Sequence, residues 1–521
     1  MQTGLNSRKT KIIVTLGKAS SSVEALVKLL QAGIDAVRIT TRFLQGEERE
    51  KVLKNLREAE TLVGRYVCVI LSLREGDIRI GNANAGCQLS LSVGDEIRIV
   101  TNKYSGTEPN TIICNNPAFP SMVRPGDKLL VEFGKAIFTV TEIEGIGSFA
   151  ESFGSFTEIP STNVEQDFKL ERYKRSKPKT LKGQKVVHCK AENECILEDG
   201  EPLNFLNASS FAYNTVNNEL EDIRLLEWAG PMDIDIIIYK QVRDKEDLDD
   251  LLSFATPPNV KRFVGIQTKE TAENPEIYLN ASDGCSIGRG ILGVETSHSA
   301  VCKLQKSLVS MCNKMGMPVF ISTQVLESMV FNDKPSRAEV FDACCAVLDG
   351  VDALMLTGET AYGHYPELAV RALHKICFEA EQYVNYAEQR RLVYESLPTP
   401  LSPMNGICYF AAEAVEKVAA QAIVCLTRSG KTAKAISRFK PSCIVVAITD
   451  SIKTLKFLRI VRGVYPIFID SNPGKDNESV AIGLCIEHEI LKSRDVVVFV
   501  GNKKDSFIEG TTTSFRIITV N

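Results

Sequence analysis

Short apolar runs alternate with amphipathic segments along most of the chain, and this pattern limits the possible folds more than any other feature. Residues 11–17, 35–40 and 65–73 are apolar runs typical of buried strands, whereas residues 21–33 and 47–64 between them have helical periodicity. Serines precede the first of these helical segments and a glycine ends it, as expected for a capped helix. The order strand–helix–strand–helix–strand predicts a parallel sheet.

The alternation stops near residue 82 and returns after about residue 212. The residues between form short alternating strands with turns, which predicts an inserted β-rich domain. Within it, residues 169–185 contain eight Lys or Arg. This basic segment is either a solvated loop or a docking surface for an acidic partner.

With the strands that follow the insertion, the chain has about eight strand–helix units, which predicts a (β/α)8 TIM barrel, an α/β fold. A further α/β pattern follows the barrel. We therefore predict an N-terminal tail at 1–9, a barrel (A domain) in two parts, 10–82 and 213–385, an inserted β lid (B domain) at 83–212, and a C-terminal α/β regulatory (C) domain at 386–521.

Composition excludes several classes of protein. A chain of 521 residues is too long for one core, and its net charge of −4 gives no overall attraction to nucleic acid or anionic membrane. The 15 cysteines include no CxxC pair, which indicates a reducing compartment. The first residues lack an apolar signal core, and no run approaches membrane-spanning length. We expect a cytoplasmic protein.

Three segments closely resemble pyruvate kinase: TKIIVTLGKAS at 10–20, IGRGILGVE at 287–295 and TQVLES…GHYP at 323–366. Further similar segments occur in the same order up to the final FRIITV. The resemblance implies a barrel with a mobile lid and a C-terminal regulatory domain. It also implies phosphoryl transfer from phosphoenolpyruvate to ADP, Mg²⁺ and K⁺ as cofactors, and usually a tetramer.

The resemblance also shows which catalytic positions differ. Phosphoryl transfer needs positive charge around the phosphoryl oxygens, and divalent metal ions need oxygen ligands. Where the family has a Lys-x-Glu motif at a strand end, this chain has VGIQT, so Gly265 replaces the lysine and Gln267 the metal-binding glutamate. In RGILG, Ile291 replaces the metal-binding aspartate. Lys269 lies four residues beyond Gly265, too far along the chain to substitute without rebuilding the strand end.

The family's monovalent-cation site is altered as well. Thr40 replaces an asparagine, Arg42 replaces the cation-binding serine, and Ser72 and Leu73 replace an Asp-Thr pair. We therefore expect no intact set of catalytic residues and no bound Mg²⁺ or K⁺. Four positions still match the family's active site: Arg38, Arg79, Gly290 and Thr323. The Thr323 hydroxyl serves either the site or the backbone around it.

The C domain contains IVCLTRSGKTAKAISRF, a strand, a hydroxyl-rich turn and a helix. A turn of this kind can bind a phosphate at the helix N-terminus, although a simple Ser/Thr cap is the alternative. It resembles the family's effector site. The predicted effector-binding residues are Thr427, Arg428, Ser429, Gly430, Lys431 and Thr432, and Lys503 and Lys504 could cover the anion.

Three functions remain open at this point. The first is a catalytically inactive member of the family that acts as a structural or regulatory subunit of glycolysis. Its partner would be an active pyruvate kinase paralogue in a hetero-oligomer, or a second copy of itself in a dimer or tetramer. The second is a divergent but active pyruvate kinase. The third is a scaffold or metabolite-binding protein outside glycolysis.

Overall fold

The structure is a computed structural model, and the chain divides into two compact units. One unit comprises Met1–Glu75, Leu226–Leu292 and Ser299–Asn521, and the other comprises Gly76–Leu225 with Gly293–His298. The predicted domain boundaries remain predictions. The structure describes all residues except 1–7, 74–77, 83–88, 102–109, 117–118, 132–133, 145–185, 198–200, 202, 207–215, 243, 254–259, 471–476, 502–511 and 521.

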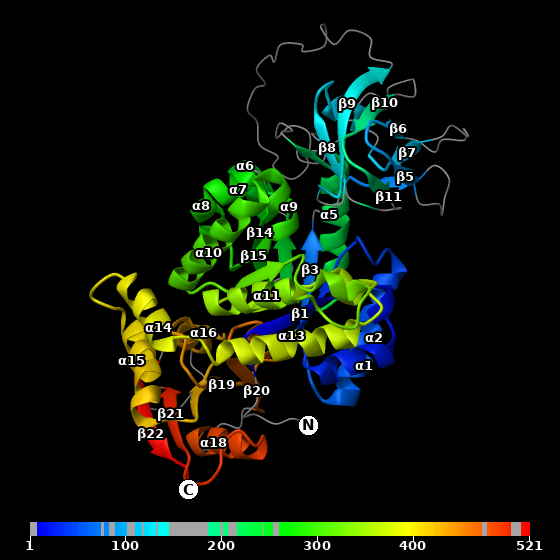
Figure 1. Ribbon diagram of the computed structural model, residues 1–521. Coiled ribbons are helices and arrows are strands. Elements are labelled where there is room, and N and C mark those ends of the chain that lie inside the picture. Colours follow the sequence, from blue (N-terminus) through cyan, green and yellow to red (C-terminus); the bar gives the residue numbers. More distant parts are fainter. Residues whose placement is uncertain are drawn as a thin grey trace, which may run out of the picture. The chain divides into compact units, whose positions relative to one another are not determined.

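The first unit contains a closed barrel of parallel strands, which confirms the predicted fold class (Figure 1). Around the barrel the strands follow the order β1-β17-β16-β15-β14-β13-β3-β2. Their apolar runs are buried on both faces, as expected where helices cover a parallel sheet. The strands are β1 (Lys11–Thr15), β2 (Ala36–Ile39), β3 (Cys68–Leu73), β13 (Ile236–Tyr239), β14 (Lys261–Ile266), β15 (Gly284–Gly288), β16 (Val319–Ser322) and β17 (Ala353–Leu356).

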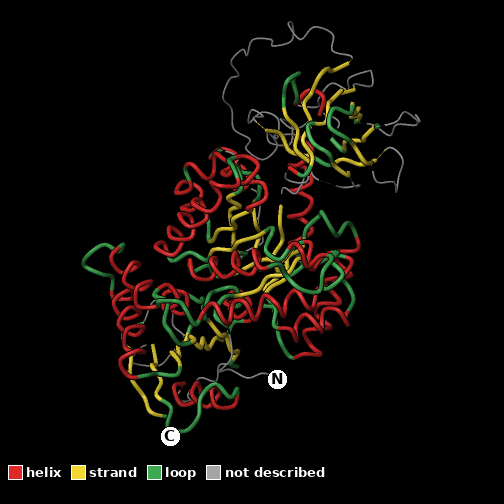
Figure 2. Tube along the Cα trace, in the orientation of Figure 1, coloured by secondary structure: helices red, strands yellow, loops and turns green. Residues whose placement is uncertain are grey.

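Helices surround the strands, as the red segments around the yellow barrel in Figure 2 show. Local capping explains several of their ends. The Ser22 hydroxyl accepts a hydrogen bond from the backbone N–H of Ala25, and Gly33 ends the same helix with φ +97°. Ser336 and Glu339 form a capping box. The helices are α1 (Val23–Ala32), α2 (Glu47–Val63), α5 (Val216–Ala229), α6 (Lys245–Ser253), α7 (Lys269–Glu273), α8 (Pro275–Asn280), α9 (Arg289–Glu295), α10 (His298–Met315), α11 (Arg337–Asp349), α12 (Gly358–Ala361) and α13 (Pro366–Glu381).

Aromatic rings fill part of the barrel interior. The rings of Phe263 and Phe320 lie 5.0 Å apart between centroids, and both side chains are fully buried. Gly284 is paired with Phe263, and a Cβ atom placed on it would lie 2.2 Å from that ring. Packing at this level of the barrel therefore depends on a residue without a side chain.

The second unit is the inserted β-rich domain. Its larger sheet has the order β12-β8-β9-β10-β6-β7-β4, and β11 pairs with β5 in a small second sheet. Apolar side chains from these strands and from α3 (Phe119–Met122) form its separate core. The strands are β4 (Ile80–Asn82), β5 (Leu89–Leu91), β6 (Glu96–Val100), β7 (Thr111–Cys114), β8 (Lys128–Val131), β9 (Ala136–Glu144), β10 (Val186–Ala191), β11 (Cys195–Leu197) and β12 (Leu203–Leu206).

The C-terminal part of the first unit is a five-stranded sheet in the order β20-β19-β18-β21-β22. The sheet is parallel except for its last strand, which pairs antiparallel with β21. Among the helices that the structure describes, none is long and apolar enough to cross a bilayer. The strands and helices of this part are β18 (Ala422–Leu426), β19 (Ile444–Thr449), β20 (Val464–Phe468), β21 (Val496–Gly501), β22 (Ser514–Thr519), α14 (Tyr386–Glu395), α15 (Pro403–Val418), α16 (Lys431–Arg438), α17 (Ile452–Leu458) and α18 (Asn477–Glu487).

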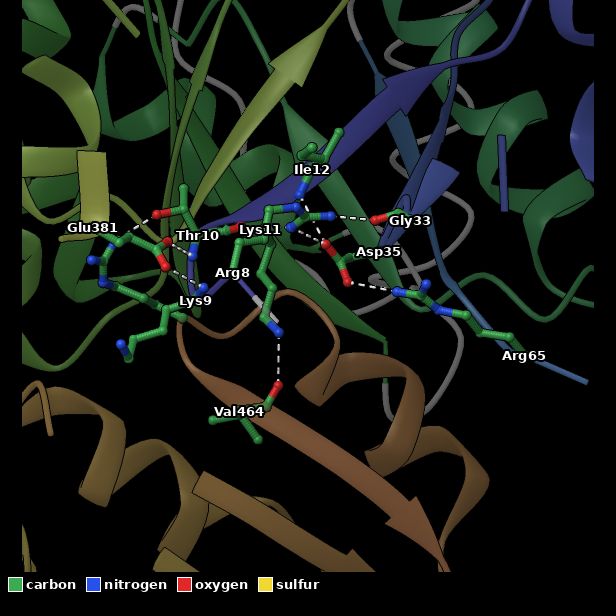
Figure 3. A network of polar contacts seen from close by, with 11 residues as sticks. Arg8, Lys9, Thr10, Lys11, Ile12, Gly33, Asp35, Arg65, Glu381 and Val464 are labelled. Atoms are coloured by element: carbon green, nitrogen blue, oxygen red, sulfur yellow. Dashed lines mark hydrogen bonds and ion pairs between the residues drawn. The ribbon is translucent and has the colours of Figure 1, made fainter. Parts of the chain in front are cut away.

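A polar network at the start of β1 joins the barrel to the C-terminal sheet (Figure 3). The Asp35 carboxylate forms ion pairs with Arg8 at 2.6 Å and Arg65 at 3.0 Å. Burial acts to raise the pKa of Asp35, but the nearby charges of Arg8, Lys11 and Arg65 together hold it well below the usual range. Lys11 donates a 2.7 Å hydrogen bond to the backbone oxygen of Val464 in β20. Burial lowers the pKa of Lys11 to about 8.

A second contact in the same network involves Glu381, at the end of α13. Its two carboxylate oxygens accept hydrogen bonds from the backbone N–H groups of Lys9 and Thr10, at 2.7 and 2.6 Å. The Thr10 hydroxyl in turn accepts from Arg462 of the C-terminal part, at 2.6 Å. The segment that precedes β1 is therefore bonded both to a barrel helix and to the C-terminal part of the unit.

Candidate active site at the barrel mouth

A layer of polar side chains lies above the apolar interior of the barrel, at the carboxyl ends of the strands. Successive residues of a strand face opposite sides, so the core positions Ile13, Ile70, Ile238 and Phe263 identify which residues point inward. The next inward positions form the mouth, where active sites of such barrels are built. These positions are Thr15, Arg38, Ser72, Lys240, Gly265, Ser286, Ser322 and Thr357.

The end of β14 carries two of the replaced positions, Gly265 and Gln267, and places both on the inner face. Gln267 is only 5% exposed, and its Nε2 has no hydrogen-bond partner among the described residues. Its Oε1 lies over Gly288, since a Cβ atom there would be 2.7 Å from that oxygen. A buried amide without a partner for its N–H group is suited to a ligand.

The next two strand ends bring together Gly290 and Thr323, two residues that were predicted to match the family's active site. The Thr323 hydroxyl accepts from the Gly290 N–H at 2.8 Å and donates to the Ser322 oxygen at 2.6 Å. Arg289 donates to the Thr323 oxygen and forms an ion pair with Asp342. This hydroxyl and this guanidinium therefore hold backbone in place. Ile291 follows in α9, half-buried, with no oxygen to offer a metal ion.

The end of β2 carries three further predicted site residues. Arg38 is 3% exposed, and its Nη1 lies 3.3 Å from the sulfur of Met355 across the barrel. The buried Thr40 hydroxyl accepts from the backbone N–H of Arg42 at 3.1 Å. The Arg42 guanidinium lies over the Phe43 ring, 5.0 Å from its centroid. Of these cations, Arg38 is the one inside the barrel.

Ser72 and Leu73 end β3 and are both fully buried. The Ser72 hydroxyl faces inward and has no hydrogen-bond partner among the described residues. Arg79 belongs to the second unit, where its backbone N–H donates to the side-chain oxygen of Asn115 at 2.8 Å.

Two charged residues at the barrel mouth were missed by the sequence reasoning. Lys240 directly follows β13 and is half-buried. Glu359, in α12, is 1% exposed and accepts from the backbone N–H groups of Leu326 and Thr357, while burial raises its pKa. A charged residue directly after an apolar strand run was the signal available for Lys240. Lys269, by contrast, is exposed on α7 and pairs with Glu273.

The predicted effector turn precedes α16. The Thr427 hydroxyl accepts from the Gly430 N–H at 3.0 Å, and Gly430 has φ +79°. Arg428 forms an ion pair with Asp450. The Thr432 hydroxyl lies 3.0 Å from that of Thr512, so the segment just before β22 reaches the start of α16. Ser429 is half-buried and Lys431 exposed, whereas Lys503, Lys504 and the basic segment 169–185 lie outside the described residues.

Neutral oxygen atoms at the mouth are the candidate ligands for metal ions. In the described part of the chain, no group of three or more His, Cys, Asp or Glu side chains is placed to hold a metal ion. The Gln267 amide oxygen and the Ser72 hydroxyl are neutral oxygen ligands, a type that divalent and monovalent cations accept alongside carboxylates or phosphates. The residues thus fit cations that are also held by a bound phosphate.

Models of protein families match nearly the whole chain. Residues 7–153 and 177–370 match the pyruvate kinase barrel domain, and residues 405–518 match the pyruvate kinase alpha/beta domain. The chain is 28% identical to a pyruvate kinase of Eimeria tenella, over 99% of this chain and 90% of that protein. It is 30% identical to a cytosolic isozyme of pyruvate kinase from Glycine max, over 94% of this chain and 93% of that protein.

These matches correct one prediction. The expectation that neither Mg²⁺ nor K⁺ is a cofactor is wrong, because Mg²⁺ and K⁺ are the cofactors of the family whose domains match here, and the replaced side chains do not show that binding is lost. The barrel, its polar mouth and the matches to both domains lead to one conclusion: the chain belongs to the pyruvate kinase family.

Proposed function

We propose that this protein is a structural or regulatory subunit of the pyruvate kinase family whose own phosphoryl transfer from phosphoenolpyruvate to ADP is lost or much slower than the family's. The observation that carries the proposal is Gly265 at the inner end of β14, where the family has its catalytic lysine. A cation placed beside a developing enolate typically contributes a few kcal/mol to lowering the barrier. Gln267 and Ile291 remove two negative charges from the same mouth.

Mg²⁺ and K⁺ remain part of the proposal. The Gln267 amide oxygen would contact the divalent ion and the Ser72 hydroxyl the monovalent ion. The divalent ion would supply positive charge to the phosphate oxygens of a bound substrate. Without two carboxylates, the protein would hold the divalent ion mainly through the substrate, so we expect a higher Mg²⁺ requirement than in a relative that has both.

Large apolar side chains on the outer helices support an oligomer. Phe341 on α11 is 72% exposed, Tyr383 after α13 is 80% exposed, and Phe410 on α15 is 55% exposed. Large exposed aromatic residues are typical of surfaces that another chain covers. We propose that an active pyruvate kinase paralogue covers them in a hetero-oligomer, because related chains present matching patches. A second copy of this chain is the alternative partner.

We also propose that the turn at Thr427–Thr432 binds a phosphate group of a metabolite. Its support is the left-handed Gly430, which opens the backbone N–H groups at the start of α16. The cytoplasm is the proposed location, as it is for the isozyme of Glycine max, whose name includes the word cytosolic.

The test is a lactate-dehydrogenase-coupled assay of the pure protein at saturating phosphoenolpyruvate and ADP, with Mg²⁺ and K⁺ varied upward. The matched control is the Glycine max enzyme, assayed in the same buffers. We expect turnover at least about 10³-fold below the control. Turnover within tenfold of the control would show an active pyruvate kinase and refute the proposal.

A separate experiment tests the subunit role. Tagged protein would be purified from the native cell and its mass measured by light scattering. Recovery of an active pyruvate kinase in the same particle supports the hetero-oligomer. A particle that contains this chain alone contradicts the hetero-oligomer and indicates self-assembly.

A further inference from the structure

Strand register places Lys240 directly beside Gly265. Strands β13 and β14 run parallel, with Tyr239 paired to Val264. Lys240 and Gly265 come next on the two strands, so they lie side by side. A Cβ atom on Gly265 would lie 3.2 Å from the Cα of Lys240 and 3.4 Å from its Cγ. The first atoms of the Lys240 side chain therefore lie next to the space that a side chain at position 265 would occupy.

Both positions belong to the inner face of the barrel. Phe263 and Ile238 are buried in the barrel core, and Gly265 and Lys240 each follow two residues later on the same face. The Lys240 stem therefore leaves the backbone toward the mouth.

Other groups of the mouth favour an anion as the ligand. The guanidinium of Arg38 lies inside the barrel, and the buried Nε2 of Gln267 has no hydrogen-bond partner among the described residues. The Ser72 hydroxyl is also buried and has no hydrogen-bond partner among the residues that the structure describes. The inward strand-end residues that the structure describes are Thr15, Arg38, Ser72, Lys240, Gly265, Ser286, Ser322 and Thr357. The Glu359 carboxylate also lies at the mouth, where two backbone N–H groups donate to its oxygens. Cations and N–H donors that gather in one place suit an oxyanion.

We propose that Lys240 supplies, from the neighbouring strand, the positive charge missing at Gly265, and that with Gln267 it binds a small carboxylate or phosphate-bearing anion at the barrel mouth. The inference rests on the proposed function, since it names what a barrel with impaired transfer would still hold. Binding by such a subunit would let the level of the anion influence the assembly.

The experiment measures binding to the full chain by isothermal titration calorimetry. Phosphoenolpyruvate, oxalate and inorganic phosphate are the three probes, each titrated with Mg²⁺ present and again in EDTA. A carboxylate-selective site binds oxalate and phosphoenolpyruvate but not phosphate, whereas a phosphate-selective site binds phosphoenolpyruvate and phosphate but not oxalate. We expect Lys240→Gln to weaken the tightest probe at least tenfold, and Lys240→Arg to recover part of the loss.

Two further variants complete the experiment. Lys269→Gln removes an exposed lysine of α7 outside the mouth, and we expect unchanged affinity. Gln267→Leu removes the unpartnered amide, and we expect weaker binding with an unchanged melting temperature or a higher one. Circular dichroism of every variant checks folding, so that lost binding is not mistaken for lost structure.

The possible results separate this inference from the proposed function. Wild-type affinity in folded Lys240→Gln, or no binding of any probe by the wild type, refutes the role of Lys240 even if the coupled assay shows no turnover. Turnover in the wild type that Lys240→Gln abolishes would refute the proposed loss of transfer and support the placement of the cation at Lys240.

Discussion

A lysine does not fit at position 265 without a local shift, because the neighbouring backbone lies close to it. A Cβ atom there would lie 3.2 Å from both the Lys240 Cα and the Tyr239 carbonyl oxygen. Contacts this short force the neighbouring strand to shift by a few tenths of an ångström. A side chain at position 265 would therefore affect the spacing of β13 and β14 as well as the charge at the mouth.

Substitution at this glycine tests that interpretation. We expect Gly265→Lys to restore no turnover in the coupled assay and to lower the free energy of unfolding by about 1–3 kcal/mol, because the added side chain overpacks two strand ends. Urea denaturation gives the stability change. Family-level turnover with unchanged stability would contradict the interpretation.

Asp235 is a buried carboxyl group with an unusual protonation equilibrium. It is 6% exposed, accepts from the backbone N–H of Val69 at 2.8 Å, and has its pKa raised to about 7 by burial, with Lys456 opposing the shift. Between the unfolded pKa of about 3.9 and this value, the folded state binds more protons than the unfolded state. Stability contributed by this group is therefore present at low pH and falls as pH rises toward 7.

The neutral variant Asp235→Asn keeps an oxygen for Val69 and removes the titration. We expect the free energy of unfolding of the variant, relative to that of the wild type, to increase with pH between 5 and 7, by at most about 1.4 kcal/mol per pH unit. Urea titrations at several pH values measure the difference. A constant difference across this range would rule out the raised pKa.

Strands and helices were predictable because each has its own periodicity in the sequence, and β1, α1, β2, α2 and β3 all lie within the predicted segments. The position of Lys240 was not, since it depends on the register between β13 and β14. Sequence spacing measures distance along one strand, whereas the mouth is built across strands. Reading along the chain drew attention to Lys269, which the structure places on the exposed side of α7.

The β14–β15 pair is an element whose geometry depends on one glycine. We expect Gly284→Ala to destabilise the protein by at least about 1–3 kcal/mol, because the methyl group would overlap the Phe263 ring. Gly406 in α15 is the matched control, since a Cβ atom there meets nothing within 4 Å. Gly406→Ala should be neutral or stabilise by up to about 1 kcal/mol. Chemical denaturation compares the two, and equal effects would contradict the packing argument.

Across the whole molecule, buried thiols and buried lysines have opposite effects on the free energy of unfolding as pH rises above 8. Burial lowers the pKa of Lys11 and Lys440 to about 8, which adds stability as pH rises toward their unfolded value near 10.4. Burial raises thiol pKa values instead, so the unfolded state loses protons first and stability falls. The thiols raised to about 12 are those of Cys114, Cys189, Cys377, Cys408, Cys443 and Cys485.

Because these thiols outnumber the two lysines, we expect a net loss of stability between pH 8.5 and 10. Urea midpoints in the presence of a reductant measure it. Cys377→Ala, a change at a fully buried site of α13, should flatten the slope with pH. A midpoint that rises through this range would show that the lysines dominate.

The polar network at the start of β1 has a mechanical consequence. Lys11 at one end of this five-residue strand is fastened to Val464, while Thr15 at the other end borders the mouth. A strand is stiff along its length, so β1 would transmit a displacement of the C-terminal sheet to the residues at the barrel mouth.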